Sequence, residues 1–261
     1  MGLQIRDMTK EDEWYVGTCT HVGEKNEEIE KCAKERIEYF RKMKKSGLKI
    51  KVALFDDQYA GFIYLFPIEI SPWEIQGENL FFIPCLVAHS NFSGHNIGKA
   101  LIEAGENEAK KQEKDGIAVS AMDWDNWFMP AEYFIHLGFE VAQRKDIELL
   151  LWKKFNENAL LPQFIEKNYS FKEIKNRVVI DLFYNTFCQT SAIEAERVRS
   201  VIKEFGNKLI LNEYPADNRI ICTRYGISRA IYINGRLLEL KAEIDKDILR
   251  KHIVAAIDSI E

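Results

Sequence analysis

The run Leu80–Ala88 constrains the fold more than any other part of this sequence, because it is apolar at almost every position. A strand with one solvent-exposed face alternates apolar and polar residues, whereas a near-continuous apolar run suits a strand that is buried on both faces. A loop follows the run, and then a helix that is expected over residues 97–113. This succession indicates an α/β fold with a buried strand at its centre.

The other elements of the first 155 residues follow from hydrophobic periodicity and turn residues. Strands are expected over residues 3–8, 49–54, 59–67, 80–88 and 117–122 and, as a hairpin, over 140–153; helices are expected over 24–45, 97–113 and 131–137. The first of these helices carries one apolar stripe, made of Ile29, Cys32, Ala33, Ile37 and Phe40. The mixture of strands and helices places the chain in the α/β (α+β) class.

The pattern stops at residues 156–176, which lack a clear period, and it restarts beyond them. We expect strands over 178–183 and 208–211, helices over 191–205 and 218–225, a hairpin with strands over 229–233 and 236–240 around Asn234-Gly235, and a last helix capped by Asp245. With 261 residues, the chain is also longer than a typical single domain. The expected organisation is therefore a domain at 1–155, a linker at 156–176 and a smaller α/β domain at 177–261.

The charge balance argues against partners that need an extensive basic surface. The net charge is −5 and the sequence pI is about 5.7, so we expect no nucleic acid and no membrane as a partner. No stretch approaches the roughly 18–20 apolar residues that span a bilayer. The first residues do not have the pattern of a secretory signal, and the expected location is the cytoplasm.

The cysteines and histidines form no recognisable metal or disulfide pattern. The five cysteines, at positions 19, 32, 85, 188 and 222, include no CxxC pair, which argues against a zinc knuckle, a dithiol redox pair and a disulfide framework. His89 and His95 are near neighbours, but no Cys or Asp completes a metal set around them. We expect no metal.

The segment Phe82–Ile102 combines a strand, a glycine-containing loop and the start of a helix. Such a loop presents several unpaired backbone N–H groups toward one point, and together with the helix dipole they suit a pyrophosphate. Gly94 and Gly98 let the backbone approach the phosphates without a Cβ in the way. The segment resembles the acetyl-CoA-binding motif of the GNAT N-acetyltransferases, Gln/Arg-x-x-Gly-x-Gly/Ala, which it matches with Ser93-Gly94-His95-Asn96-Ile97-Gly98.

Two positions depart from that motif, and a second motif supports it. Ser93 replaces Gln or Arg, and Asn96 replaces the central Gly; Asn tolerates left-handed backbone angles best among the other residues, so the loop shape can survive. The run Tyr133–Phe139 is similar to the family's FYxxxGF element, in the right order and spacing. The resemblance covers roughly residues 1–155 and implies the GNAT fold with a mixed central sheet.

The resemblance also implies where acetyl-CoA would bind. Strands 80–88 and 117–122 would be parallel and splay apart, and the pantetheine arm would pair with the backbone of Leu86, Val87 and Ala88. The pyrophosphate would lie on the N–H groups of Gly94, His95, Asn96, Ile97, Gly98 and Lys99. Asn126 lies close to a position where relatives hold the pantetheine. The acetyl group would then pass to a primary amine of a small molecule or a peptide.

The catalytic groups follow less directly from the motifs. Attack by a neutral amine needs a base for its proton and an acid for the departing thiolate. The family's frequent acid is a tyrosine at the position of Phe134 here; Tyr133 stands one step earlier, about 100° round the helix, and either residue could serve in packing alone. The base candidates are His89, Glu78 and Asp123. An apolar acceptor pocket, a lid or core packing is expected from Trp124, Trp127, Phe128 and Met129.

The segment Val179–Ser191 is a strand, a cysteine and a helix, which resembles the first βα unit of the thioredoxin fold. Cys188 and Ser191 form CxxS where the redox form has CxxC; a Cys188 thiolate would be stabilised by the helix N-terminus and could attack disulfides or electrophiles. The fold's cis-Pro is absent, and Arg229 stands near its place. The run Ala230–Gly235 resembles a characteristic sequence run of the YoaP-like domain. This domain is found C-terminal to such acetyltransferases. The alternative is a binding or dimerisation module, and hence a homodimer, with Cys188 only partly exposed.

The sequence leaves two functions open for the chain. One is an N-acetyltransferase that uses acetyl-CoA as cosubstrate, with Tyr133, His89 and Cys188 as candidate catalytic residues. The other is a catalytically degenerate acyl-CoA-binding sensor with a thioredoxin-like binding or monothiol redox module. Ser93, Asn96 and Phe134 motivate this alternative, because each departs from the family pattern.

Overall fold

The computed structural model describes residues 2–124, 126, 128–239 and 243–260 of the chain. The chain divides into two compact units, each built from segments that are distant in the sequence. Unit 1 consists of Met1–Thr20, Phe40–Ser71 and Ile75–Ile165, and unit 2 consists of His21–Tyr39, Pro72–Glu74 and Glu166–Glu261.

Unit 1 contains a mixed sheet with the strand order β1-β2-β3-β5-β7-β9-β8, and β6 pairs with β3 beside this path. Its strands are β1 (Leu3–Asp7), β2 (Lys49–Phe55), β3 (Gln58–Pro67), β5 (Leu80–Ile83), β6 (Leu86–Ala88), β7 (Gly116–Met122), β8 (Glu140–Lys145) and β9 (Glu148–Lys154). The strands β5 and β7 are parallel, and the other pairs are antiparallel. A second, two-stranded sheet pairs β4 (Ile75–Gln76) with β10 (Gln163–Phe164). The predicted α/β class with a mixed central sheet is confirmed.

The run Leu80–Ala88, which we predicted as one strand, is two strands. Pro84 lies between β5 and β6 and has no N–H to donate to a ladder. Along β3, the pairing register shifts by one residue between β5 and β6. β5 is buried on both faces as expected, whereas β6 is half-buried or exposed. An extra residue bends a strand and increases its twist, and from this bulge onward the chain pairs with β3 without pairing with β7.

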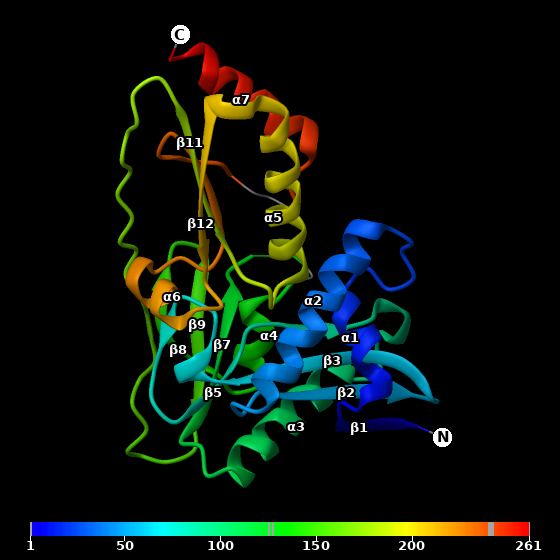
Figure 1. Ribbon diagram of the computed structural model, residues 1–261. Helices are drawn as coiled ribbons and strands as arrows, with labels where there is room; N and C mark the ends of the chain where they lie inside the picture. The colour runs from blue at the N-terminus through cyan, green and yellow to red at the C-terminus, as the bar shows by residue number, and fades with distance from the viewer. Residues whose placement is uncertain (1, 125, 127, 240–242, 261) are drawn as a thin grey trace. The chain divides into compact units, whose positions relative to one another are not determined.

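Helices lie on both faces of the large sheet of unit 1. The helix α3 (Ile97–Lys111) covers one face and α1 (Glu13–Thr18) lies on the other (Figure 1). The inner face of α3 contains Leu101, Ile102 and Ala109, which are buried in the same core as residues of strands β3, β5 and β7. The short helix α4 (Ala131–His136) closes this core. Short 3-10 helices lie at Lys10–Asp12, Ile68–Ile70 and Ser90–Phe92 in unit 1, and at Lys203–Lys208 in unit 2.

A buried carboxylate fixes the start of α1, which the sequence pattern had not predicted. Asp12 accepts two hydrogen bonds from the Arg6 guanidinium, at 2.5 and 2.8 Å, and one from the backbone N–H of Thr9 at 2.7 Å. The hydroxyl of Tyr59 donates a further bond at 3.0 Å. Burial would raise the pKa of Asp12, but the bonds from Arg6, Thr9 and Tyr59 outweigh it and hold that pKa well below its usual range. The ionised carboxylate thereby ties α1 to β1 and β3.

Unit 2 contains a four-stranded sheet with the order β12-β11-β13-β14. β11 (Val178–Tyr184) is parallel to β12 (Leu209–Pro215) and antiparallel to β13 (Ala230–Ile233), which pairs with β14 (Arg236–Leu237). The helices α5 (Gln189–Ile202) and α7 (Lys246–Asp258) share one apolar core with this sheet, and α6 (Arg219–Tyr225) follows β12. The predicted hairpin turn is confirmed, since Asn234 and Gly235 have φ values of 47° and 77°. The predicted cap is confirmed as well, because Asp245 accepts bonds from the first N–H groups of α7.

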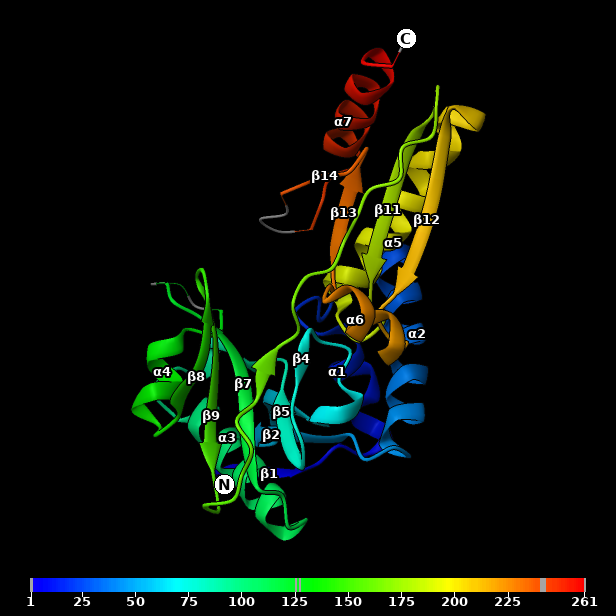
Figure 2. The ribbon, with the colours of Figure 1, turned by 90° about the vertical axis from the view of Figure 1, so that its left-hand side faces the viewer.

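The segment before β11 lies along the sheet of unit 2 (Figure 2). The ring of Tyr169 stacks on that of Tyr232 with 4.0 Å between centroids, and its hydroxyl donates to buried Asp181 at 2.7 Å. The N–H of Asn168 donates to the carbonyl of Tyr225 at 2.9 Å. Residues 168–169, which lie in the predicted linker, are therefore bound to the sheet.

Most of the helix α2 (Glu27–Lys44) belongs to unit 2, where it packs against α5. Ile29 and Cys32 form a small apolar cluster with Ala192 and Ile193. The guanidinium of Arg36 is buried, donates to the carbonyl of Phe187 and lies 5.5 Å from the centre of its ring. The predicted apolar stripe of α2 is buried as expected, and part of it completes the C-terminal fold.

Candidate functional site

The two central strands of unit 1 separate at their carboxyl ends. β5 pairs with β7 from Leu80 opposite Gly116 to Ile83 opposite Val119. Beyond this point β6 pairs only with β3, and β7 continues along β9, as far as the described residues show. One edge of Leu86–Ala88 is thus free to pair with an extended ligand. These are the residues predicted to hold a pantetheine arm.

The loop after β6 turns its backbone amides toward one point at the start of α3. The loop forms a 3-10 turn at Ser90–Phe92, and then Gly94 and Asn96 adopt positive φ values of 82° and 57°. The left-handed conformation predicted for Asn96 is confirmed. The amides of Gly94, Asn96, Ile97, Gly98 and Lys99 find no acceptor among the described residues. Unpaired amides at a helix N-terminus attract an anion such as a phosphate.

Aromatic contacts hold this loop against β2. The ring of His95 lies 4.2 Å from that of Phe55, and Phe92 lies 5.7 Å from the same ring. The N–H of His95 donates to the carbonyl of Phe92 at 3.3 Å, so it is less available to a ligand than the amides that follow. The sequence had assigned His95 to the phosphate site; the structure assigns its ring a packing contact.

Tyr133, not Phe134, faces the start of α3. A Cβ built on Gly98 would lie 2.7 Å from the hydroxyl oxygen of Tyr133, which shows how closely this side chain approaches the first turn. Phe134 is buried in the core and meets the ring of Phe139 edge-on. Burial, assisted by the charge of Glu103, raises the pKa of Tyr133 above its ordinary value. The phenol is therefore protonated at neutral pH and can donate a proton or a hydrogen bond beside the amides.

His89 follows β6 directly and is half-buried. Its backbone N–H donates to the carbonyl of Ala60 at 2.9 Å, and its Nε2 lies 2.7 Å from the hydroxyl of Tyr15 in α1. Burial lowers the pKa of His89 from its ordinary value of 6.5. The imidazole is consequently neutral at pH 7 and above.

The remaining acid–base and lid candidates divide between the two ends of the sheet. Asp123 follows β7 at the end where the strands separate, is exposed, and pairs with Arg144 at 2.6 Å. Glu78 precedes β5 and therefore lies at the opposite end of that strand from the separation. Asn126 is exposed, and Trp124 donates from its indole N–H to the carbonyl of Phe128 at 3.0 Å. Met129 is a core residue, and Trp127 lies outside the described residues.

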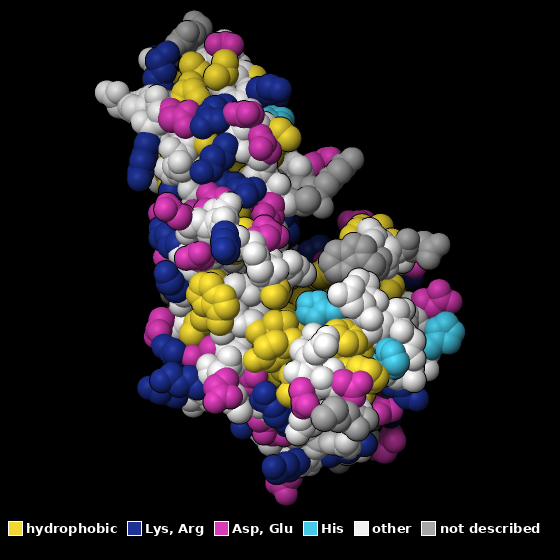
Figure 3. Space-filling view, turned by 90° about the vertical axis from the view of Figure 1, so that its right-hand side faces the viewer, with side chains coloured by type: hydrophobic (Ala, Val, Ile, Leu, Met, Phe, Trp, Pro, Cys, Tyr) yellow, Lys and Arg dark blue, Asp and Glu magenta, His cyan; other side chains and the backbone are white. Residues whose placement is uncertain are grey.

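The surface of the molecule shows apolar and histidine side chains side by side. Figure 3 shows yellow apolar side chains gathered around cyan histidines on one face. Large apolar side chains of unit 1 with a third or more of their surface exposed include Trp14, Tyr59, Trp124 and Tyr133.

In unit 2, the predicted thiol Cys188 is the N-cap residue of α5 and is half-buried. Asn185 holds this turn, since its side-chain oxygen accepts the N–H of Cys188 at 2.8 Å and its own N–H donates to the Ser191 hydroxyl at 3.0 Å. The Ser191 side chain is buried. Cys188 thus has the position at a helix start that the sequence predicted.

Arg229 lies close enough to Cys188 for their charges to interact. Its guanidinium donates two hydrogen bonds to the buried carboxylate of Glu194, both at 2.7 Å. No peptide bond among the described residues is cis. Because Glu194 lies in α5, the pair joins the residue before β13 to the helix that begins at Cys188.

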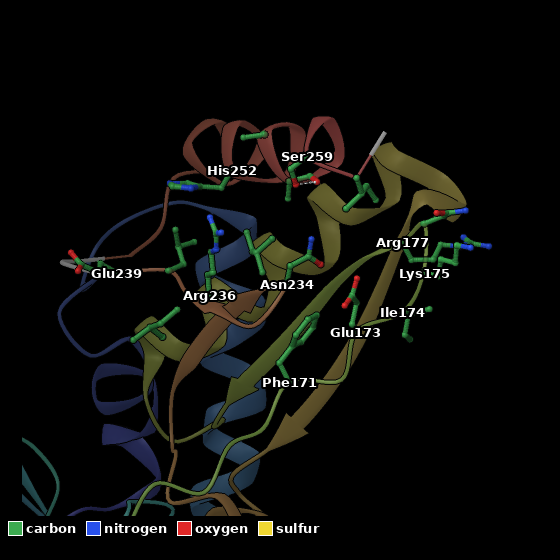
Figure 4. Close-up of a pocket in the computed structure, with 17 residues that line it drawn as sticks. Phe171, Glu173, Ile174, Lys175, Arg177, Asn234, Arg236, Glu239, His252 and Ser259 are labelled. Atoms are coloured by element: carbon green, nitrogen blue, oxygen red, sulfur yellow. Dashed lines mark hydrogen bonds between the residues drawn. The ribbon is translucent and has the colours of Figure 1, made fainter.

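Unit 2 also contains a groove of about 980 Å³ between the segment 171–177, the turn after β13 and α7. Figure 4 shows Phe171 and Arg236 below α7, with His252 projecting from that helix. Its lining mixes the cations Lys175, Arg177 and Arg236 with the carboxylates Glu173 and Glu239. None of the residues predicted to bind acetyl-CoA or to be catalytic lines it.

The described part of the chain offers no group of three His, Cys, Asp or Glu side chains that could hold a metal ion. It also contains no helix that is long and apolar enough to cross a membrane.

Comparison with known proteins gives similarity of structure only. No family model matches the sequence, and no curated protein matches it. Among solved structures, it is similar to the PaiA N-acetyltransferase of Thermoplasma acidophilum in complex with coenzyme A, with 20% identity, 59% of this chain and 100% of that chain covered, and a TM-score of 0.44. It is also similar to a GNAT-family acetyltransferase from Staphylococcus aureus, with 17% identity, 59% of this chain and 99% of that chain covered, and a TM-score of 0.44. A third similar structure is a GNAT-family acetyltransferase from Brucella melitensis in complex with acetyl-CoA. The identity is 15%, the alignment covers 62% of this chain and 93% of that chain, and the TM-score is 0.41. TM-scores below 0.5 at these identities do not assign the chain to a family.

The contact between Gly98 and Tyr133 predicts the effect of a branched side chain at position 98. Gly98→Val should displace the Tyr133 hydroxyl and crowd the amides, and it should weaken coenzyme A binding roughly tenfold or more, about 1.4 kcal/mol. Lys99→Ala is the matched control, because Lys99 is exposed and makes only a 3.8 Å pair with Glu103, so its loss should cost less. Calorimetry measures both, and equal losses would contradict this placement of the phosphate loop.

Proposed function

We propose that unit 1 binds acetyl-CoA and transfers its acetyl group to a primary amine, as a GNAT-type N-acetyltransferase. One observation carries the proposal: the free edge of β6 leads directly to unpaired amides at the start of α3. An extended pantetheine arm fits the edge of β6, and a pyrophosphate fits the unpaired amides. The backbone supplies both features, which is why the substitutions Ser93 and Asn96 in the motif leave the site intact.

In this proposal the side chains act on the proton and on the leaving group. A neutral amine attacks the acetyl carbonyl, the bond from that carbon to sulfur breaks, and the amide forms as the amine loses its proton to solvent water. Tyr133 donates its phenol proton to the departing thiolate, for which its raised pKa keeps it protonated. His89 lines the opposite side of β6, and the exposed aromatic residues of α1 and β3 contact the acceptor, a small molecule or a peptide.

For unit 2 we propose a thioredoxin-like fold of the YoaP-like kind. The parallel pair β11 and β12, joined through α5, and the antiparallel pair β13 and β14, followed by α7, form a compact version of that topology. Cys188 is proposed as a reactive monothiol, supported by its place at the start of α5. A homodimer and a cytoplasmic location complete the proposal.

An acyl-CoA-binding sensor is the second candidate. It is favoured by Phe134, which is buried in the core at the position where the family places its frequent tyrosine acid. In a sensor, the backbone site would bind the cofactor and Tyr133 would only pack on Gly98. The two candidates differ in turnover, not in binding.

Turnover can be measured as release of the coenzyme A thiol with a panel of amines, polyamines, aminoglycosides and peptide N-termini. The transferase should release thiol with at least one acceptor above the acceptor-free background. Tyr133→Phe should lower kcat about a hundredfold, the lower range for loss of a general acid, with coenzyme A affinity unchanged. Ile135→Ala, on the exposed side of the same helix, is the matched control. Tight coenzyme A binding without turnover on any acceptor would favour the sensor.

The Cys188 proposal predicts a thiol that reacts at lower pH than a free cysteine. In a chain whose other cysteines are replaced by Ser or Ala, the alkylation rate should reach its midpoint below about pH 8.5, because the helix N-terminus stabilises the thiolate. A chain that keeps only Cys19, a half-buried thiol at a helix C-terminus, is the control. A midpoint at or above that pH, or no labelling of the folded protein, would leave only the interaction module.

A further inference from the structure

The imidazole of His89 lies on the face of the sheet opposite α3. Val87 pairs with Phe62, and the ring of Phe62 meets Tyr15 edge-on with 5.5 Å between centroids. Side chains two residues apart along a strand share a face, and His89 continues the pairing of β6 through its bond to Ala60. Its side chain therefore lies beside α1, next to the edge of β6 that no described strand covers.

Packing on several sides fixes the hydroxyl of Tyr15. The residue is 6% exposed, and its ring stacks on that of Tyr59 with 4.0 Å between centroids and 14° between planes. Tyr59 is itself held by its bond to Asp12. The only described hydrogen-bond partner of the Tyr15 hydroxyl is Nε2 of His89, at 2.7 Å. This bond can form with the proton on either atom, and the two arrangements give His89 different chemistry.

In one arrangement Nε2 carries the proton and donates it to Tyr15. The phenol proton then lies in a buried site without an acceptor among the described residues, which costs about 1–3 kcal/mol. In the other arrangement Tyr15 donates to Nε2, and the single proton of the neutral imidazole is on Nδ1. The Tyr15 hydroxyl and Nε2 are then both satisfied, and the N–H of Nδ1, which has no acceptor among the described residues, is available to a further oxygen.

We propose that Tyr15 is a positioning residue that holds His89 as the Nδ1–H tautomer, so that His89 donates a hydrogen bond to an oxygen of the bound thioester or acceptor. The lone pair of Nε2 is occupied by Tyr15, and Nδ1 already carries a proton, so His89 does not remove the proton of the amine. The tautomer follows from the geometry of the apo chain, and the donor role rests on the proposed acetyl transfer.

Burial affects both partners in the direction that this arrangement needs. It lowers the pKa of His89 and raises that of Tyr15, whose neighbours Cys19 and Tyr59 act in the same direction. Above about pH 7 the pair is a neutral imidazole and a protonated phenol.

The tautomer can be read directly from nitrogen chemical shifts. A long-range proton–nitrogen correlation spectrum of the labelled full chain at pH 8 separates protonated from unprotonated imidazole nitrogens, and His89→Asn identifies the His89 signals among the five histidines. We expect protonated Nδ1 in the wild-type chain and protonated Nε2 in Tyr15→Phe. Protonated Nε2 in the wild-type chain would overturn the proposal. Tyr59→Phe, which removes a hydroxyl but no bond to His89, should leave the pattern unchanged.

A substitution pair tests the donor role. The amide nitrogen of Asn reaches the position of Nδ1, and that of Gln reaches the position of Nε2. His89→Asn should therefore keep kcat/KM within about threefold, whereas His89→Gln should lose about tenfold or more. Equal losses in both variants, with a wild-type rate that falls as His89 is protonated, would identify a base and contradict the donor role. If the wild-type chain shows no turnover with any acceptor, the proposed acetyl transfer is wrong. The nitrogen chemical shifts still test the proposed tautomer of His89 in that case.

Discussion

The separation of β6 from β7 is the constraint on which the site of unit 1 depends. β5 and β7 form the only parallel pair in the described part of the sheet, and their ladder ends at Ile83 opposite Val119. Pro84 and a one-residue register shift then turn the chain toward β3 alone. One bulge thereby does two things, because it frees a strand edge and it directs the following loop to the start of α3. The proposed phosphate and pantetheine sites are two parts of one backbone feature, which requires no charged side chain.

The side chains around this feature are fixed from opposite faces of the sheet. On one face, α3 and α4 bring the hydroxyl of Tyr133 against Gly98. On the other face, the ionised carboxylate of Asp12 holds Tyr59, the ring of Tyr59 supports Tyr15, and Tyr15 binds His89. A protonated phenol and a neutral imidazole consequently flank the strand edge.

The sequence predicted the elements of both units well where periodicity or turn residues are strong, as in α3, in the β2–β3 hairpin and in the turn at Asn234-Gly235. It missed α1, whose six residues Glu13–Thr18 show no helical period. It also merged β5 and β6, because a bulge adds one residue without changing the apolar composition. The conformation of the loop before α3 could be predicted, because Gly94 and Asn96 are residues that tolerate positive φ values. The sequence could not predict the bond between Tyr15 and His89, because these residues lie 74 positions apart. It could not predict the packing of α2 on α5 either, because the two helices belong to separate segments of the chain. An apolar stripe predicts that a face is buried but not which element covers it.

The central claim is that backbone amides at the start of α3 bind the pyrophosphate of acetyl-CoA. Amide hydrogen exchange, measured with and without saturating coenzyme A, tests it most directly, because the amides of Gly94 and Asn96–Lys99 have no acceptor among the described residues and should exchange fast in the free chain. Coenzyme A should slow exchange in residues 86–99 more than anywhere else, while the groove beside Phe171 in unit 2 should be unaffected. Protection at that groove, or none in residues 86–99 when coenzyme A is bound, would contradict it.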